Sequence, residues 1–291
     1  MYQICPEVGV LANNKQQLVT AFDNSDSDAS EDILFLHANG FPPGTYQQCL
    51  SEIKSVRRIY TVEHRPLWDD DAPGILHWSQ YADDTLTVLR RERTEPVWLL
   101  GHSMGGAISL MLAARAPELV KGVILLDPVV FSSRFWLFAK VAFWLWPDRS
   151  KMVQSALRRP HHFDSFDAAF NFYRSKRAFS NIQDQGLWDY VNAAHQAQED
   201  GSVTLRYSGK WEACVYRSPP SLWSTIGKLR KPLSVLAGRQ SYVVLPSIAD
   251  KLSSYPSLHF DWMDAGHLLP LEEPTKTAQW VTARMEKSMV N

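Results

Sequence analysis

Residues 97–106 read Val-Trp-Leu-Leu-Gly-His-Ser-Met-Gly-Gly, and this stretch decides the fold. Its apolar first half predicts a buried strand, and the residues from 105 onward predict a helix that follows at once. The glycines at 101 and 105 complete the pattern G-x-S-x-G, in which the turn from strand to helix is so tight that a Cβ at either glycine would collide with it. We therefore expect Ser103 to stand on a strained turn with its hydroxyl exposed.

Chemistry follows from the position of Ser103 at the start of a helix. The first N–H groups of that helix point toward the place where negative charge develops on an attacked carbonyl. A serine hydroxyl is a weak nucleophile at neutral pH, so it needs a histidine as general base and a carboxylate that holds the histidine. His267 is our candidate base, because it follows the last predicted strand and comes after the serine in the chain.

Strand and helix patterns alternate along most of the chain, which predicts an α/β fold: a mostly parallel central sheet with helices on both faces. The predicted strands are 17–22, 33–37, 56–62, 97–100, 120–126, 233–237 and 258–263, and the predicted helices are 46–54, 78–91, 105–116 and 275–287. The alternation stops between residues 128 and 224, where aromatic residues crowd a helix-like stretch without a convincing pair of buried strands. We expect a core formed by residues 1–127 and 225–291, with 128–224 inserted as a helical cap.

Several motifs together resemble the α/β-hydrolase superfamily. They are the loop His-Ala-Asn-Gly-Phe-Pro-Pro-Gly at 37–44, the Gly-His-Ser-Met-Gly-Gly turn, the aromatic insertion and the sequence Asp-Ala-Gly-His-Leu-Leu-Pro-Leu-Glu-Glu-Pro at 264–274. Within that superfamily the chain is most similar to capped serine hydrolases of the esterase and lipase kind. The resemblance implies fold and nucleophile but not substrate, because the superfamily hosts many reactions. A serine at the turn argues against haloalkane dehalogenases and epoxide hydrolases, which carry aspartate there.

The resemblance also implies two backbone donors that hold the oxyanion, one after the nucleophile and one in the 37–44 loop. We assign them to Met104 and Phe41, with Ala38 or Asn39 as alternatives for the loop donor. His37 is expected to brace this loop beside the substrate pocket.

The acid of the expected triad departs from the superfamily pattern. Ser241 stands where members usually carry the carboxylate. Some members carry it one strand earlier, and there this chain has Asp127, which is our candidate acid. The alternative reading is that Asp127 only caps the turn ahead of Pro128. Asp264 is too close to His267 in the chain to brace its ring, and Asp250 falls on a predicted helix.

The cap and its surroundings are expected to decide what binds. Aromatic residues of the insertion favour a hydrophobic acyl or aryl substrate, and we expect the pocket to be lined by His37, Trp68, Phe131 and Trp136. Arg158, Arg159, His161 and His162 predict a solvated face, or alternatively a site for a carboxylate or phosphate.

Composition limits the remaining possibilities. The 291 residues carry 30 basic and 31 acidic side chains, a net charge of -1, so there is no basic excess for binding nucleic acid. Cys5, Cys49 and Cys214 lack the spacing of a disulfide framework or zinc site, and no metal or nucleotide cofactor motif occurs. The first ten residues do not form a secretion signal, which predicts a cytoplasmic protein. Residues 135–146 are too short to span a bilayer, but suit a membrane surface or an apolar pocket.

These observations predict a cofactor-independent serine hydrolase that cleaves a hydrophobic ester through an acyl-enzyme on Ser103. Acyl transfer or carbon–carbon bond cleavage on the same residues is the alternative within enzymes. A ligand-binding protein with impaired catalysis is the alternative outside them, and Ser241 motivates it. The sequence does not indicate an oligomeric state.

Overall fold

A seven-stranded sheet runs through the part of the chain that the computed structural model describes, residues 17–24, 29–68 and 72–290. The strand order is β1-β3-β2-β4-β5-β9-β10, and all neighbours are parallel except β1 and β3. The predicted strands are confirmed with small changes at their ends. Their bounds are β1 Leu18–Asp23, β2 Asp32–Leu36, β3 Arg58–Val62, β4 Val97–His102, β5 Val120–Leu126, β9 Leu233–Gly238 and β10 Leu258–Met263.

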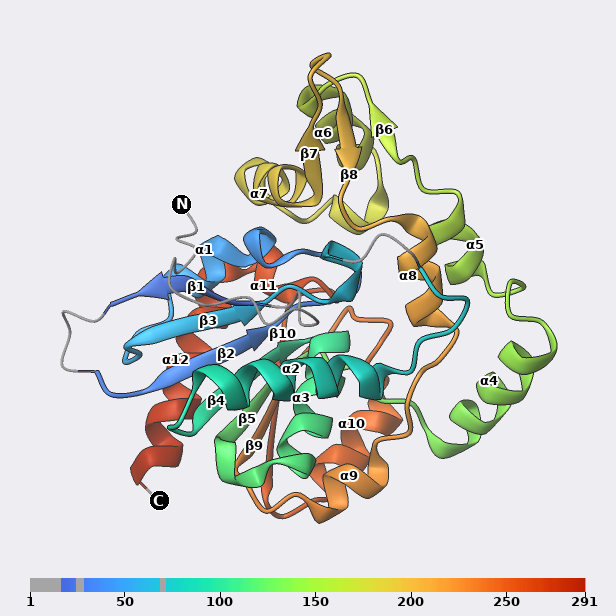
Figure 1. Ribbon diagram of the computed structural model, residues 1–291. Coiled ribbons are helices and arrows are strands. Elements are labelled where there is room, and N and C mark those ends of the chain that lie inside the picture. The colour runs from blue at the N-terminus through green and yellow to red at the C-terminus, as the bar shows by residue number, and fades with distance from the viewer. Residues whose placement is uncertain (1–16, 25–28, 69–71, 291) are drawn as a thin grey trace.

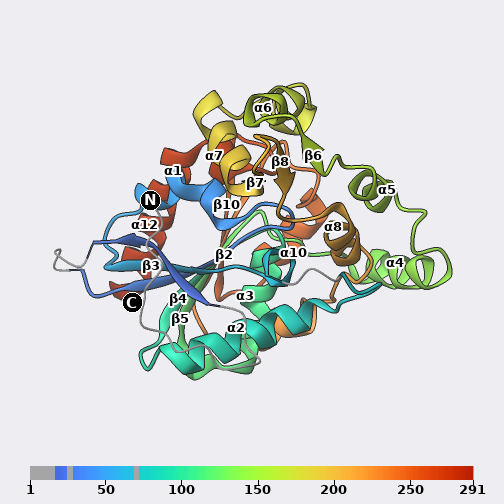
Figure 2. The same ribbon diagram turned by 45° about the horizontal axis from the view of Figure 1, so that its top comes forward.

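Helices cover both faces of this sheet, as the alternating pattern predicts (Figures 1 and 2). One face carries α2 Trp78–Glu92, α3 Met104–Arg115, α9 Trp223–Lys228 and α10 Pro246–Ser253. The other carries α1 Gln47–Ser51, α11 Leu269–Glu272 and α12 Pro274–Val290. Short 3-10 helices occur at Pro43–Tyr46, Arg65–Leu67, Pro117–Leu119 and Arg177–Phe179.

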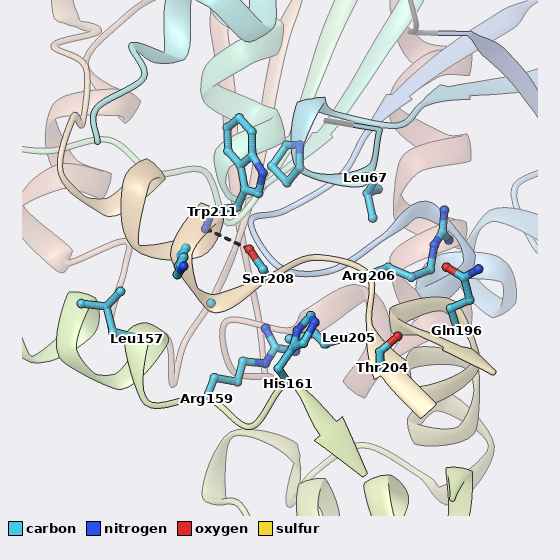
Figure 3. Close-up of a pocket in the computed structure, with 13 residues that line it drawn as sticks. Leu67, Leu157, Arg159, His161, Gln196, Thr204, Leu205, Arg206, Ser208 and Trp211 are labelled. Carbon is cyan, nitrogen blue, oxygen red and sulfur yellow. Dashed lines mark hydrogen bonds between the residues drawn. The ribbon is translucent and has the colours of Figure 1, made fainter. Parts of the chain in front are cut away.

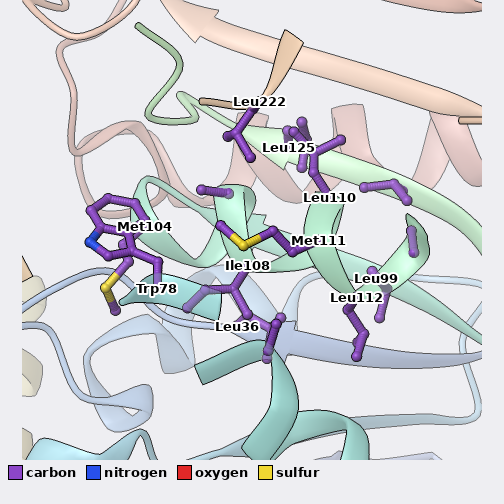
Figure 4. Close-up of a cluster of buried hydrophobic side chains, with 14 of the residues drawn as sticks. Leu36, Trp78, Leu99, Met104, Ile108, Leu110, Met111, Leu112, Leu125 and Leu222 are labelled. Carbon is purple, nitrogen blue, oxygen red and sulfur yellow. The ribbon is translucent and has the colours of Figure 1, made fainter. Parts of the chain in front are cut away.

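Side chains of the central strands alternate between two apolar layers. Leu34 and Leu36 of β2 belong to the layer under α2 and α3, whereas Ile33 and Phe35 belong to the layer under α1 and α12. Figure 4 shows part of the first layer, where Leu36, Leu99 and Leu125 of three strands lie in one apolar cluster with Ile108, Leu110 and Leu112 of α3. Because both faces are covered, most positions of the central strands β2, β4 and β5 are apolar, which explains the continuous apolar runs in the sequence.

The chain between β5 and β9 leaves the main sheet and forms a second, smaller unit beside it (Figure 1). Its helices are α4 Ser133–Leu145, α5 Lys151–Leu157, α6 Phe166–Arg174, α7 Asp184–Ala194 and α8 Gly209–Tyr216. A three-stranded antiparallel sheet in the order β6-β8-β7 joins them, with bounds His162–Phe163, Val203–Leu205 and His195–Ala197. The sequence showed no convincing pair of buried strands in this stretch, and the strands found there are short and partly exposed. Strands of two or three residues are too short to show alternation.

The end of this insertion packs into the core. Trp211, Cys214 and Val215 of α8 lie in the same apolar cluster as Trp78 of α2, and the Trp78 indole N–H donates to the Val215 carbonyl over 2.9 Å. The proposed cap of residues 128–224 therefore shares buried surface with the proposed core. Cys49 and Cys214 are both buried free thiols, and Cys5 lies outside the described residues.

Asp32, at the start of β2, forms ion pairs in which its own carboxylate is buried. It is 2% exposed, accepts from Arg57 at 2.6 Å and also pairs with Arg93. Burial alone would raise the pKa of Asp32, but the hydrogen bond from Arg57 and the charges of Arg93 and Arg57 lower it below the ordinary 3.8. The resulting stabilisation is present above pH 3.8 and is lost as the pH falls through the lower pKa of the folded state.

We predict that Asp32→Asn lowers the free energy of unfolding by about 3 kcal/mol at neutral pH, because it leaves Arg93 without its charge partner in a buried place. Urea unfolding followed by circular dichroism measures this. Glu118→Gln is the matched control, since the Arg90–Glu118 pair is 58% and 61% exposed, and we expect it to cost less than about 0.5 kcal/mol. Equal losses in the two variants would contradict the assignment.

Candidate active site

Ser103 occupies the turn between β4 and α3 in a backbone conformation that L-residues rarely adopt. Its φ and ψ are 54° and -114°. A Cβ on Gly105 would lie 1.9 Å from the Leu36 carbonyl oxygen, and one on Gly101 would lie 2.4 Å from the Gly105 carbonyl oxygen. Both contacts are with backbone atoms that cannot move aside, so the glycines are required for this turn.

The three residues predicted to act together do meet in space. The Ser103 hydroxyl lies 3.0 Å from Nε2 of His267, and Nδ1 of His267 lies 2.6 Å from Oδ2 of Asp127. Ser103 follows β4, Asp127 follows β5 and His267 follows β10, so the carboxyl ends of three parallel strands bring them to one edge of the sheet. The geometry fits a hydroxyl that donates to Nε2 and a ring N–H at Nδ1 that donates to the carboxylate.

Asp127 is fully buried, and its carboxylate is held by donors from the β9 end of the sheet. The Gly238 N–H donates to Oδ1 over 2.8 Å, and the Ser241 hydroxyl donates to Oδ2 over 2.5 Å. The residue at the usual acid position therefore donates a hydrogen bond to the candidate acid, which follows the neighbouring strand. In the sequence Ser241 marks only a missing carboxylate, and this contact is not visible there because it joins residues far apart in the chain.

The two other acidic candidates do not approach His267 in this way. Asp264 accepts from the Gln240 side chain at 3.1 Å in an exposed place, and Asp250 lies on α10.

Backbone contacts on both sides of His267 fix the loop that carries it. The Glu272 carboxylate accepts from the N–H groups of Gly266 at 2.7 Å and Leu268 at 3.2 Å. His102 Nε2 lies 2.9 Å from the His267 carbonyl, and His102 Nδ1 lies 2.8 Å from the Tyr46 hydroxyl. Burial, with the charge of His267, lowers the pKa of His102 to about 3. A neutral His102 can therefore donate to His267 and accept from Tyr46.

The loop of residues 37–44 packs directly against the turn at Ser103, but the N–H that we assigned as an oxyanion donor is already used. The Phe41 N–H donates to the Ala38 carbonyl over 3.2 Å, and the Ala38 N–H donates to the Tyr46 hydroxyl over 3.3 Å. The assignment of Phe41 was wrong, because Gly40 at φ 76° folds residues 38–41 into a turn that uses the Phe41 N–H. The Asn39 N–H has no hydrogen-bond partner among the described residues, and neither has the Met104 N–H.

His37 braces this loop, as we expected. We also expected it to line the pocket, but its side chain has no exposed surface with which to do so. It is fully buried. Its Nδ1–H donates to the Ala38 carbonyl over 2.8 Å, and its Nε2 accepts the His64 N–H over 3.2 Å. Burial lowers the pKa of His37 to about 4, so the ring is neutral near pH 7.

The predicted aromatic pocket residues are half-buried and are held by their own surroundings. The Trp68 indole donates to the Glu63 carbonyl over 2.9 Å, the Trp136 indole donates to the Pro219 carbonyl over 3.0 Å, and the Phe131 ring lies 5.2 Å from that of Phe135. Their placement as pocket residues stays a prediction. Tyr242, which sequence analysis did not single out, does approach the site: its ring centroid lies 5.6 Å from that of His267.

Arg159 does not belong to the solvated face that the sequence predicted. Its guanidinium pairs with Glu212 at 2.7 Å and bonds the hydroxyls of Tyr190 and Tyr173. A Cβ on Gly40 would lie 3.2 Å from this guanidinium, so the ion pair touches the 37–44 loop. Arg158, His161 and His162 are exposed, as expected.

Arg159 also borders a hollow of about 600 Å³, with Leu67, His161, Arg206 and Trp211 around it (Figure 3). Ser103, Asp127 and His267 are not among the residues that line it. In the described part of the chain, no group of three or more His, Cys, Asp or Glu side chains is arranged to hold a metal ion.

A serine on a strand-to-helix elbow, hydrogen-bonded to a histidine after the last strand of a mostly parallel sheet, defines the α/β-hydrolase class of proteins. The sequence pattern of the alpha/beta hydrolase family matches residues 33–280, and the chain belongs to this family.

Individual relatives are distant or match over short stretches. The monoglyceride lipase of Mus musculus is 50% identical over 38 residues, which cover 13% of this chain and 12% of the lipase. Lipase LipV of Mycobacterium tuberculosis is 24% identical over 203 residues, 65% of this chain and 69% of LipV. The crystal structure of E-2-(acetamidomethylene)succinate hydrolase superposes with a TM-score of 0.74 at 19% identity, over 92% of this chain and 94% of that one. This last likeness shows the shared fold.

We predict that Gly105→Ala lowers the free energy of unfolding by at least about 3 kcal/mol, because the new methyl group would overlap the Leu36 carbonyl. Gly227→Ala in α9 is the control, since its Cβ would meet nothing closer than 3.6 Å. There we expect a gain of about 0.5–1 kcal/mol. Thermal unfolding of both variants tests the point, and an unchanged Gly105→Ala protein would show that the turn is not as tight as described.

Proposed function

We propose that this protein is a serine hydrolase that cleaves a carboxylic ester with a hydrophobic acyl or aryl group through an acyl-enzyme on Ser103. The observation that carries the proposal is the chain of hydrogen bonds from the Ser103 hydroxyl to His267, at 3.0 Å, and from His267 to Asp127, at 2.6 Å. Separations of this size allow a proton to pass from the hydroxyl to Nε2 as the oxygen attacks.

In the first half of the reaction, Nε2 of His267 removes the hydroxyl proton while the Ser103 oxygen bonds to the ester carbonyl carbon. The imidazolium that forms is stabilised by the Asp127 carboxylate, whose orientation Gly238 and Ser241 fix. His267 then gives the proton to the leaving alcohol, and the acyl group stays on Ser103.

The negative charge on the carbonyl oxygen requires donors that are not already used. The N–H groups of Met104 and Asn39 meet this condition, and they belong to two segments in direct contact, because Leu36 abuts Gly105. We assign the oxyanion site to these two groups, with the start of α3 adding its positive end.

In the second half, water takes the place of the alcohol. His267 removes a proton from the water, the hydroxide attacks the acyl carbon, and the proton returns to the Ser103 oxygen as the acid leaves. The same hydrogen bonds therefore serve both halves.

The ester and its apolar acyl group are supported by two kinds of observation. Among the relatives are proteins named monoglyceride lipase and Lipase LipV. The half-buried Phe41 of the 37–44 loop packs against the buried rings of Tyr190 and Phe179, at 5.1 and 6.0 Å, so the side chains around the loop of the proposed oxyanion site are aromatic.

We predict that p-nitrophenyl esters from acetyl to long acyl chains are hydrolysed, and that Ser103→Ala lowers kcat by at least about 10³-fold. Release of nitrophenol by matched preparations measures both quantities, and the best chain length reports the size of the acyl site. Ser254→Ala, at an exposed position after α10, should keep full activity. Equal activity in Ser103→Ala would sink the proposal.

The position of the acid gives a sharper prediction. Asp127→Ala should lower kcat by up to about 10⁴-fold with little change in KM, since the acid acts on the imidazolium and not on substrate binding. Because the Ser241 oxygen lies 2.5 Å from the carboxylate oxygen that His267 uses, an aspartate at 241 should reach the vacated place.

We therefore expect the double variant Asp127→Ala/Ser241→Asp to recover at least about tenfold in kcat over Asp127→Ala. Asp127→Ala/Ser241→Asn has the same shape without the charge and should recover nothing. If both double variants behave like Asp127→Ala while Ser241→Ala alone is fully active, Ser241 does not lie where the acid is needed.

A further inference from the structure

The helix α4 turns an apolar stripe outward. Leu137, Phe138, Val141, Trp144 and Leu145 follow one another at the spacing i, i+1, i+4, i+7 and i+8, which places them on one side of a helix. Helices of globular proteins bury such a stripe, yet these side chains are 46–80% exposed. Ala139 is the one residue of α4 that is buried.

The opposite side of α4 is the one that packs on the protein. Phe143 contacts an apolar cluster formed by Val153 and Ala156 of α5 and Ala213 of α8, and the Trp136 indole bonds the Pro219 carbonyl. One side of α4 is therefore anchored to the protein, and the opposite, exposed side is apolar as well. In Figures 1 and 2, α4 lies at the margin of the molecule, away from the main sheet, and no described element covers its outer side.

Exposed apolar residues continue beyond α4. We call residues 132–158, which comprise α4 and α5, the α4–α5 arm. Phe135, Trp146, Met152 and Leu157 of this arm are also exposed. Most soluble proteins expose apolar side chains singly, whereas here they gather on two successive helices. Such a gathering indicates a surface that binds a lipid layer or another molecule.

The charges of the arm favour one kind of partner. Arg134, Lys140, Arg149, Lys151 and Arg158 are all exposed, whereas Asp148 is the only acidic residue of the arm. Asp148 is paired with Arg217 at 2.5 Å. The chain as a whole has a net charge of -1, so this positive charge is a local feature.

We propose that the α4–α5 arm binds the surface of an anionic lipid bilayer. The outward stripe enters the boundary between head groups and acyl chains, and the lysines and arginines contact the anionic head groups. Trp144 and Trp146 suit this depth, because their rings combine apolar area with a polar N–H. The arm lies on the bilayer and does not cross it, since α4 has 13 residues. Nowhere among the described residues is a helix long and apolar enough to cross a membrane.

A second copy of the chain would fit the same surface less well. A symmetric contact between two arms would bring their cations together, and the arm has no free acidic side chain to compensate them. An anionic surface accepts the apolar stripe and the cations together. The proposal does not rest on the proposed hydrolase activity, although a bilayer is also a place where apolar esters collect.

Co-sedimentation of the full chain with vesicles tests the proposal. We expect binding to vesicles of phosphatidylcholine with about one third phosphatidylserine, and at least about tenfold weaker binding to phosphatidylcholine alone or in about 1 M salt. Phe138→Glu/Trp144→Glu should lose binding, and Lys140→Glu/Lys151→Glu should lose the preference for anionic vesicles. Leu245→Glu, at a 51% exposed position outside the arm, should bind like the wild type. Ser103→Ala should do so as well, so that docking and catalysis are tested separately.

Two results would overturn the proposal. One is that the wild type does not sediment with anionic vesicles, or does so no better than Phe138→Glu/Trp144→Glu when both are folded by circular dichroism. The other is that light scattering shows a dimer that Phe138→Glu/Trp144→Glu converts to a monomer, since the arm would then be an interface between copies.

Discussion

The contact between Gly105 and the Leu36 carbonyl is the constraint on which the site depends. A Cβ on Gly105 would lie only 1.9 Å from the Leu36 carbonyl oxygen. The glycine therefore allows the end of β2 to pack directly against the start of α3. The same contact holds Ser103 at φ 54° and places the 37–44 loop beside the turn. The proposed nucleophile and both candidate oxyanion donors are thereby positioned by backbone packing, which changes little during a reaction.

A second constraint is electrostatic. Asp127 is fully buried, and a buried carboxylate is tolerated only where donors surround it. Gly238, Ser241 and His267 supply those donors from β9, the loop after β9 and the loop after β10. Because β5 and β9 are neighbours in the sheet, the candidate acid after β5 and the Ser241 hydroxyl after β9 meet beside the same histidine nitrogen. Ser241 occupies the position that the carboxylate does not use.

Much of the fold and part of the candidate site could be predicted from the sequence, because they depend on patterns of neighbouring residues. The strands and the glycines of the turn depend on neighbours within a few residues, and the order of Ser103 and His267 is read directly from the chain. The failures concern hydrogen bonds that the sequence pattern does not show, some within the 37–44 loop and some between distant segments. A turn closed by Gly40 uses the Phe41 N–H, and the His37 ring bonds the loop instead of facing a pocket. Arg159 is held by Glu212 and by the hydroxyls of Tyr173 and Tyr190. For residues 135–146 the sequence left a membrane surface and an apolar pocket as alternatives, because a helix that is apolar on both sides does not show which side packs on the protein.

The central claim is that Ser103 is an activated nucleophile, and a fluorophosphonate probe tests it most directly. The probe forms a covalent bond only with a serine whose proton a base removes. Mass spectrometry of the labelled, digested protein should find one phosphonyl group per chain on the peptide that contains Ser103, and His267→Ala should slow the labelling strongly. Folded wild-type protein that stays unlabelled, or that is labelled at another serine, would contradict the account.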